Sequence, residues 1–273
     1  MKIIVLIVNY NSWDKTLAML ESGDALEVIP EFYVLDNNSD INPIPCIRTI
    51  REKYSDVNIV NFATNFGYFG AVHEFLRVSP HLQFDWLFIA NSDLLFSDPC
   101  VFNYLDDFLA EAQGVGIYCP SVISAVTGRD QNPFLLKKPS RLYYYKYAII
   151  SSSFMLSKLY YSLFMLKSVL MAVQHKRTVK QKCSRYIFAP HGSFLGFSST
   201  FFQKGGVIEN RNFLFYEEEI AGFICDALGL VVVYDPRVQI FHEEHATTGS
   251  GLTKAKICIK KKSLSILKKY MLI

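Results

Sequence analysis

Hydrophobic residues form short continuous runs in the first half of the chain, and most of these runs end at a polar residue. The apolar runs are residues 2–8, 32–36, 57–62 and 86–90. Their β-branched and aromatic content is typical of strands that are buried on both faces. Helical stretches are expected between and after them, at 14–21, 69–78 and 99–112. This alternation predicts an α/β fold with a doubly wound, mixed and mostly parallel sheet flanked by helices.

Three polar residues follow strands of this predicted sheet: Asn9, Asp36 and Asp93. A single polar residue after a strand is an ordinary turn former. In doubly wound sheets, however, ligands bind at the carboxyl ends of the strands. Three polar side chains at one edge therefore favour a ligand site over three unrelated turns.

The pattern changes over residues 139–175, which are rich in Tyr, Phe, Leu and Met. Lys146, Lys158 and Lys167 interrupt this segment, so it lacks the roughly 20 apolar residues of a transmembrane helix. Two interpretations stay open: helices that cover the sheet, or a helical insertion that lies in a membrane interface. Mixed strand and helix resumes at Tyr186, with the clearest strand at 230–236.

The last twenty residues, 254–273, contain seven lysines and no acidic residue. On a helical wheel Lys261, Lys262, Ser265, Lys268 and Lys269 share one side, and Leu264, Ile266, Leu267, Tyr270 and Met271 share the other. An anionic membrane surface attracts such a basic amphipathic helix. The alternative is a terminal helix that packs on its own domain; the charge pattern favours the membrane.

Composition narrows the class of protein. The 273 residues are 51% hydrophobic, which excludes global disorder and allows one large domain or two small ones. A net charge of +3 is too small to argue for nucleic-acid binding. Six cysteines without a CxxC pair indicate reduced thiols in the cytosol. The N-terminal apolar run is too short for a signal peptide and is interpreted as a buried strand.

Seven short motifs occur in a defined order. They are IVNYNSWD (7–14), VLDNNSD (34–40), NFGYFGA (65–71), FIANSD (88–93), HGSFLGFS (191–198), FLFYEEEIAGF (213–223) and YDPRVQIFH (234–242). In this order and spacing the series resembles the family-2 glycosyltransferases of the GT-A fold, in particular rhamnosyltransferase-like members that build bacterial surface polysaccharides. The resemblance covers about residues 1–125 and 186–250.

The resemblance implies a nucleotide-diphosphate sugar donor at the carboxyl edge of the sheet. The loop of Asn9, Tyr10 and Asn11 would close over the nucleotide. Asp36 would bind its base or ribose, since a carboxylate accepts paired hydrogen bonds. The junction at Asn65 and Gly67, together with Gly70, would approach the diphosphate, where glycine permits close backbone contact.

Asn91-Ser92-Asp93 matches the metal-binding acidic signature of that family. Asp93 would coordinate Mg²⁺ or Mn²⁺ between the phosphates, with Asn91 and Ser92 beside the donor. His242 resembles the histidine that adds a metal or phosphate contact. The ion would neutralise charge on the departing nucleoside diphosphate.

Three consecutive acids, Glu217, Glu218 and Glu219, supply candidates for the catalytic base. Like charges this close raise at least one pKa, which suits proton transfer. The resemblance assigns the base to Glu218, with Glu219 as the alternative register, and places His191, Gly192 and Ser193 on the acceptor side. It implies single displacement with inversion at the sugar.

The expected organisation is one catalytic domain, 1–250, followed by a tail, 251–273. Within it, 1–125 would bind the donor, 139–185 would form a helical insertion, and 186–250 would carry the base and acceptor site. The acceptor would be a glycan or lipid-linked glycan of O-antigen, lipopolysaccharide or capsule synthesis. The protein would lie in the cytoplasm, peripherally at the inner face of the plasma membrane, without nucleic acid.

Three other functions compete with this interpretation. A dinucleotide-dependent oxidoreductase would need a glycine-rich turn after the first strand, and NYNSWD has none. A nucleotidyltransferase usually has a glycine- and lysine-rich loop near its start, which is also missing. A catalytically weak or inactive membrane-associated scaffold with the same fold remains compatible with Asn91 in the metal motif and with glutamate where the family more often has aspartate.

Overall fold

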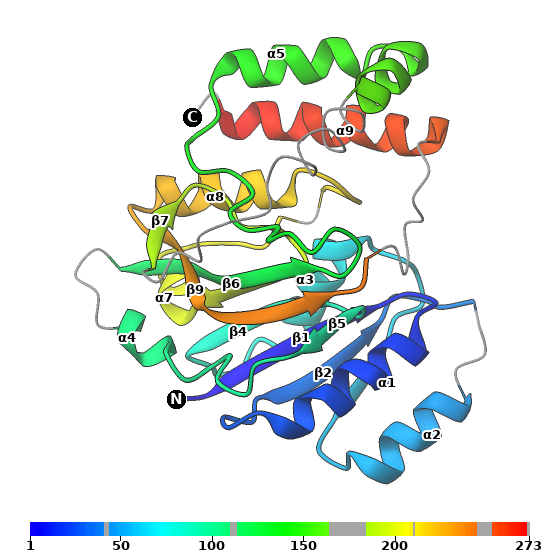
Figure 1. The fold of residues 1–273 in the computed structure, drawn as a ribbon, viewed down its shortest axis with the longest axis vertical. Coiled ribbons are helices and arrows are strands. Elements are labelled where there is room, and N and C mark those ends of the chain that lie inside the picture. Colours follow the sequence, from blue (N-terminus) through cyan, green and yellow to red (C-terminus); the bar gives the residue numbers. More distant parts are fainter. Residues whose placement is uncertain (41–43, 110–113, 164–183, 210, 245–252, 272–273) are drawn as a thin grey trace.

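A mixed β-sheet runs through the centre of the protein (Figure 1). The computed structural model describes residues 1–40, 44–109, 114–163, 184–209, 211–244 and 253–271. The strands in these ranges are β1 (Ile3–Asn9), β2 (Glu31–Asp36), β3 (Asn58–Asn61), β4 (Trp86–Asn91), β5 (Leu94–Phe96), β6 (Val115–Ser124), β7 (Arg185–Ile187), β8 (Phe194–Ser198) and β9 (Val231–His242). Among the described residues the strand order is β3-β2-β1-β4-β8-β6-β9-β5, with β7 paired to β9.

The parallel part of the sheet is its N-terminal half. Strand β1 pairs in parallel with β2 and β4, and β2 does so with β3. Further along, β8 runs antiparallel to β4 and β6, while β5 and β7 run antiparallel to β9. Strands β6 and β9 are parallel. The α/β fold and the mixed sheet are confirmed, with more antiparallel pairing in the second half than the sequence indicated.

Strand β1 is buried on both faces, as its sequence predicts. Ile3, Val5 and Ile7 enter the core on one side of the sheet, and Ile4, Leu6 and Val8 enter the core on the other. Because successive side chains of a strand point to opposite faces, this run requires helices on both sides.

Helices flank the sheet on both faces and in a further outer layer. They are α1 (Trp13–Ser22), the short 3₁₀ helix η1 (Gly23–Ala25), α2 (Ile44–Lys53), α3 (Tyr68–Val78), α4 (Leu105–Leu109), α5 (Arg141–Ile150), α7 (Ser199–Gln203), α8 (Glu217–Ala227) and α9 (Lys254–Met271). Helices α1, α2 and α4 contribute to the first core, and α3, α7 and α8 contribute to the second. Figure 1 shows α1 and α2 on one side of the sheet and α8 on the other.

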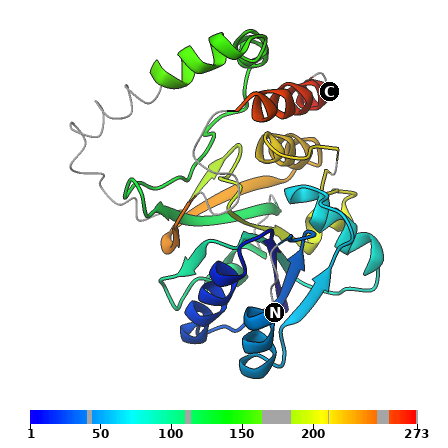
Figure 2. The ribbon, with the colours of Figure 1, turned by 90° about the vertical axis from the view of Figure 1, so that its right-hand side faces the viewer.

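A third layer covers the outer side of α8. It consists of α5 and α9, which lie one above the other in Figure 1 and remain beyond α8 in Figure 2. The apolar side of α9, including Leu264, Ile266 and Leu267, is buried in a small core with Ile220 and Phe223 of α8. The residues predicted for the basic side of α9, 261, 262, 265, 268 and 269, are exposed. The tail is therefore amphipathic as predicted, but its apolar side packs on its own domain.

Two local expectations change. The helix expected over 99–112 is limited to α4, with turns over 99–104, and residues 110–113 lie outside the described residues. Helix α2 was not predicted. It buries Ile50, and one buried residue gives only a weak apolar pattern in the sequence.

The insertion predicted over 139–185 is helical where it is described. Helix α5 is followed by helical residues 154–163, while 164–183 lie outside the described residues. Exposed apolar side chains gather here: Leu142, Tyr145, Ile149, Met155, Leu156, Leu159 and Leu163. In the described part of the chain, no helix combines the length and apolar character needed to cross a membrane.

Candidate active site

A cavity of about 780 Å³ lies where β1 and β4 end, and side chains of α8, α5 and α9 line it on the other side. Strand register brings the predicted edge together, since Asn9 lies opposite Asp36 and Val8 lies opposite Asn91. The predicted site residues that line the cavity are Tyr10, Asn65, Gly67, Asn91, Ser92, Asp93, His191, Gly192, Ser193, Glu217, Glu218, Glu219 and His242. Its lining does not include Asn9, Asn11 or Asp36 among the described residues.

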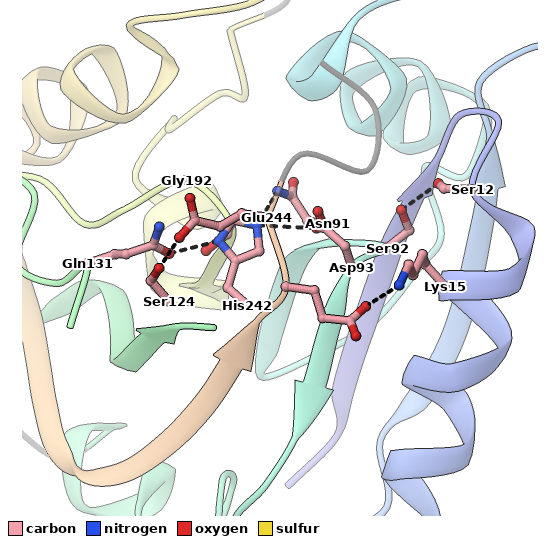
Figure 3. A network of polar contacts seen from close by, with 12 residues as sticks. Ser12, Lys15, Asn91, Ser92, Asp93, Ser124, Gln131, Gly192, His242 and Glu244 are labelled. Carbon is pink, nitrogen blue, oxygen red and sulfur yellow. Dashed lines mark hydrogen bonds and ion pairs between the residues drawn. The ribbon is translucent and has the colours of Figure 1, made fainter. Parts of the chain in front are cut away.

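Asp93 and His242 form a buried pair at one end of this cavity. The pairing of β5 with β9 sets Leu94 opposite His242, which brings the preceding Asp93 to the same place. Oδ1 of Asp93 lies 3.2 Å from Nε2 of His242. On the other side of the imidazole, Nδ1 lies 2.7 Å from Oε1 of Gln131 (Figure 3). An Nδ1–H that donates to Gln131 leaves the lone pair of Nε2 facing Asp93.

This pair fits a divalent cation that is shared with a ligand. A carboxylate oxygen and an imidazole nitrogen are accepted by Mn²⁺, and an outer hydrogen bond such as that to Gln131 orients a ligating histidine. Nδ2 of Asn91 lies 3.5 Å from the same Nε2. No cluster of three or more His, Cys, Asp or Glu side chains suited to a metal occurs in the described part of the chain. The remaining ligands would have to be oxygen atoms of a bound phosphate or water.

Polar contacts fix the segments around this pair. Lys15 of α1 forms an ion pair of 2.7 Å with Glu243, directly after β9. Ser124 at the end of β6 donates to Glu244, and the hydroxyls of Ser12 and Ser92 lie 2.7 Å apart (Figure 3). The edge that carries Asp93 and His242 is thus tied to both α1 and β6.

Asn9 and Asp36 organise the loops behind the cavity wall. Nδ2 of Asn9 donates to Oδ1 of Asp36 at 2.9 Å, and its Oδ1 accepts from Ser12 and Thr16. Oδ1 of Asp36 also accepts from the hydroxyl of Ser39. The other carboxylate oxygen of Asp36 has a long contact of 3.4 Å with the backbone N–H of Ser39. The turn-forming role of Asp36 is therefore realised, and its predicted contact with a nucleotide stays a prediction.

Asn11 also holds a loop, because its Oδ1 accepts from the backbone N–H of Asp40 at 2.7 Å. Its predicted contact with the nucleotide stays a prediction. Tyr10 lies between this loop and the cavity, which it lines, and its hydroxyl lies 3.3 Å from Asp40.

The junction before α3 is held by Asn37. Its Nδ2 donates to Oδ1 of Asn65 and to the carbonyl of Gly67, each at 3.0 Å, and its Oδ1 accepts from the N–H of Phe66. Gly67 has φ of +80°, and a Cβ there would lie 2.1 Å from the carbonyl oxygen of Phe213. Only glycine permits this backbone approach. The sequence singled out Asn65 and Gly67 but missed Asn37.

The three glutamates form the first turn of α8, where the helix dipole favours negative charge. Burial raises the pKa of all three, that of Glu217 well above its usual range and that of Glu219 to about 8. Glu218 is the least buried of the three side chains, and its Oε1 accepts from the N–H of Gly192 at 3.2 Å. Oε1 of Glu219 accepts from the hydroxyl of Tyr143 at 2.8 Å. Glu218 is thus the most accessible of the three acids, and the N–H of Gly192 fixes its orientation.

His191 and Ser193 lie between the three glutamates and the pair of Asp93 and His242. Nδ1 of His191 lies 2.9 Å from the hydroxyl of Ser193, and its ring centre lies 5.7 Å from that of His242. Burial, together with His242, lowers the pKa of His191 to about 4. His191 is therefore neutral at physiological pH and acts as a hydrogen-bonding partner.

The far wall of the cavity is aromatic and comes from the insertion, from the residues directly before α8 and from the tail. Tyr143, Tyr147, Tyr160, Tyr161, Phe215 and Tyr216 line it. Lys260 of α9 also lines the cavity, and its ammonium lies 4.6 Å from the ring centres of Tyr161 and Phe215. Elements outside the segments that carry the motifs thus complete the cavity.

No family model and no curated protein matches this sequence. Solved structures do match. Over 93% of the chain the protein superimposes on GalNAc-T7 in complex with UDP, GalNAc and Mn²⁺, with a TM-score of 0.63 and 11% identity. Over 100% of the chain it superimposes on residues 1–349 of S. aureus TarS in complex with UDP-GlcNAc, with a TM-score of 0.58 and 11% identity. These neighbours are nucleotide-sugar glycosyltransferases of the GT-A type. The chain has the GT-A fold.

A third GT-A neighbour is the mannosyltransferase PcManGT from Pyrobaculum calidifontis, solved with GDP-Man and Mn²⁺. It matches over 99% of the chain, with a TM-score of 0.56 and 12% identity. The chain covers 46% of GalNAc-T7 and 72% each of the TarS fragment and PcManGT. It therefore spans less than half of the first of these proteins.

Several residues that shape the cavity of this GT-A domain were not predicted. They are Asn37, Tyr68, Gln131, Tyr143, Glu244 and Lys260. Tyr68 is informative, because it begins α3 and its hydroxyl donates to the carbonyl of Gly192 at 2.8 Å. It lies inside the motif NFGYFGA, which could have pointed to it. Gln131 follows no motif and is positioned by long-range packing alone.

Proposed function

We propose that the protein is an inverting glycosyltransferase that moves a sugar from a nucleotide-diphosphate sugar to an acceptor hydroxyl. The observation that carries this proposal is the presence of Asp93, His242 and Glu218 around one cavity at the carboxyl ends of parallel strands. A cavity of this size accommodates a nucleotide sugar. The GT-A neighbours, crystallised with UDP, UDP-GlcNAc or GDP-Man, support a donor of this class.

The donor would lie at the end of the cavity near β1. Tyr10 and Asn65 line that end, and the backbone of Gly67 would lie close to the donor. Asn91 and Ser92 lie beside Asp93 and His242. Asp36, Asn9 and Asn11 are proposed to act on the nucleotide through the loop 9–11. Their hydrogen bonds hold this loop in place, and the loop would position the nucleotide.

Asp93 and His242 would hold Mg²⁺ or Mn²⁺ together with the donor phosphates. When bound, the ion supplies positive charge that offsets the charge on the departing nucleoside diphosphate. Gln131 keeps the imidazole of His242 oriented for this role.

Glu218 would act as the base. The acceptor oxygen forms a bond to the anomeric carbon, its proton passes to the carboxylate of Glu218, and the electron pair of the breaking C–O bond leaves with the nucleoside diphosphate. Attack from the face opposite the leaving group inverts the anomeric centre. Glu219 and Glu217 are the alternatives as base, and His191, Gly192 and Ser193 would border the acceptor.

The acceptor is proposed to be a glycan or lipid-linked glycan of surface-polysaccharide synthesis, such as O-antigen, lipopolysaccharide or capsule, met at the cytoplasmic face of the plasma membrane. The exposed apolar side chains of α5 and residues 154–163, among them Met155 with 80% of its surface exposed, support a membrane contact. Residues 139–163 contain Arg141, Lys146 and Lys158 and no acid, which suits anionic lipid headgroups.

The test is release of nucleoside diphosphate from a panel of UDP-, GDP- and dTDP-linked sugars, with and without Mn²⁺. We expect release from at least one donor, strengthened by Mn²⁺. Wild-type protein that releases none of them would support the scaffold interpretation and refute transferase activity.

A further inference from the structure

Two buried carboxylate oxygens in the cavity wall have no hydrogen-bond partner among the described residues: Oε1 of Glu217 and Oε2 of Glu219. Both side chains are at least 96% buried, and both line the large cavity. A buried polar atom without a partner costs about 1–3 kcal/mol, so such atoms in a cavity wall indicate the place of a ligand. The base assigned to Glu218 does not use either of them.

Glu219 lines the same cavity, and Tyr143 fixes its orientation. The hydroxyl of Tyr143 donates to Oε1 at 2.8 Å. Burial and the neighbouring Glu218 raise the pKa of Glu219 to about 8, so the carboxyl group is protonated at neutral pH. Because Oε1 is already an acceptor for Tyr143, the proton lies on Oε2, which is then a donor without a partner among the described residues.

Aromatic side chains line the same cavity. The ring centres of Tyr143 and Tyr147 lie 4.7 Å apart, and that of Tyr216 lies 6.4 Å from that of Tyr147. A sugar ring has hydroxyl groups at its rim and C–H groups on its faces. The negative faces of aromatic rings attract such C–H groups, while the rim needs polar partners of the kind that Glu219 offers.

Resting on the transferase function proposed above, we propose that this wall is the acceptor subsite, which takes a neutral sugar ring. The ring packs on Tyr143 and Tyr147, one hydroxyl accepts from Glu219, and a neighbouring hydroxyl faces Glu218. The ring of Tyr143 contacts the sugar, while its hydroxyl positions Glu219. Acceptor recognition is thus shared between α8 and α5, and α5 lies outside the segments that carry the glycosyltransferase motifs.

The test uses the full chain, with p-nitrophenyl glycosides of glucose, galactose, mannose, rhamnose and N-acetylglucosamine as acceptors and the donor found active in the release assay. We expect Glu219→Ala to raise the KM for the accepted glycoside about tenfold, as loss of one hydrogen bond from a buried site does. Glu219→Gln keeps a donor at the same position and should stay within about threefold. The Kd for UDP, or for the nucleotide of the active donor, should stay unchanged in both variants.

Tyr143→Phe removes the hydroxyl and keeps the ring, and we expect it to raise the same KM about threefold to tenfold without a matching loss in kcat. Tyr145→Phe is the matched control, because Tyr145 is exposed on the same helix. An unchanged acceptor KM in Glu219→Ala, or a loss of kcat in Glu219→Gln as large as that in Glu218→Gln, would overturn the proposal. The proposal would also be overturned if the wild type hydrolyses its donor but no glycoside of the panel accelerates the release of nucleoside diphosphate. Absence of donor turnover in the wild type would instead refute the transferase function itself.

Discussion

Nε2 of His242 lies 3.2 Å from Oδ1 of Asp93, although the two residues are far apart in the sequence. The antiparallel pairing of β5 with β9 creates this contact. Gln131 holds the far side of the imidazole, so that the two potential ligand atoms face one another. The account of donor binding depends on this pair.

Glu218→Gln should abolish transfer and leave donor binding intact, because the amide keeps the shape but cannot accept the proton. We expect kcat to fall by about 10²-fold or more, the scale of general-base catalysis. The measurement is kcat alongside the Kd for the nucleoside diphosphate. Wild-type turnover by this variant would remove Glu218 from the role of base.

Gly192→Ala tests the same carboxylate without touching it. A Cβ at position 192 would lie 2.4 Å from Oε1 of Glu218, so the end of that side chain must move. Displacement of the base by about an ångström should lower kcat by about tenfold to a hundredfold. Gly205→Ala is the control, because a Cβ there meets nothing within 4 Å. Equal kcat values for Gly192→Ala and the wild type would contradict the assigned position of the base.

Gly67→Ala should destabilise the fold and weaken donor binding. It combines a positive φ with a Cβ placed 2.1 Å from the backbone of Phe213. Gly128→Ala is the matched control, with φ of +66° and open space around it. We expect the control to lose about 1 kcal/mol and Gly67→Ala several kcal/mol of unfolding free energy in urea. Equal losses of unfolding free energy in the two variants would contradict this prediction, because they would show that the backbone of Phe213 moves away from the new Cβ at little cost.

The stability of the protein should depend on the charge of Glu219. Its pKa in the folded state, about 8, lies above the value of 4.5 for a free side chain, so folding favours the protonated form. The stabilisation is complete below pH 4.5 and is lost as the pH rises toward 8. Glu219→Gln removes this dependence. The unfolding free energies of the two proteins, measured in urea, should therefore diverge between pH 5 and pH 8, in favour of the variant, by a few kcal/mol at most (on the order of 1.4 kcal/mol per pKa unit). Parallel curves would refute a neutral Glu219.

The exposed apolar side chains of the insertion should bind membranes. Cosedimentation with vesicles that contain anionic lipid should retain the wild type, and Met155→Ser with Leu159→Ser should weaken retention about tenfold or more, because each side chain buries apolar area worth about 1.5–3 kcal/mol. Val78→Ser on α3 is the control for an equally polar change at an exposed site. Retention that is indifferent to all three substitutions would remove the membrane contact.

The edge of the sheet could be predicted because it follows from local rules. Apolar runs define β1, β2 and β4, and parallel register then aligns Asn9, Asp36 and Asn91 at one edge without further information. Side-chain direction could not be predicted in this way. Asp36 turns toward Ser39 instead of the cavity, which depends on the loop conformation.

The far wall depends on tertiary packing that no local pattern encodes. The helical wheel correctly separated the two sides of α9, yet at 100° per residue Lys260 falls on the apolar side, and it reaches the cavity because α9 packs on α8. Likewise, the sequence left open whether the tyrosines of α5 pack on the sheet or lie in a membrane interface. Only the fold places Tyr143 against Glu219.

Binding of nucleoside diphosphates tests the central claim most directly. Calorimetric titration of UDP, GDP and dTDP into the wild type, with and without Mn²⁺, should show one preferred nucleotide whose affinity rises at least about tenfold with the ion, as expected when metal and phosphate bind together. Asp93→Asn should abolish that gain, while Asp106→Asn, at an exposed position on α4, should keep it. A preferred nucleotide that binds Asp93→Asn and the wild type equally well in Mn²⁺, or no binding of any nucleotide, would contradict the account.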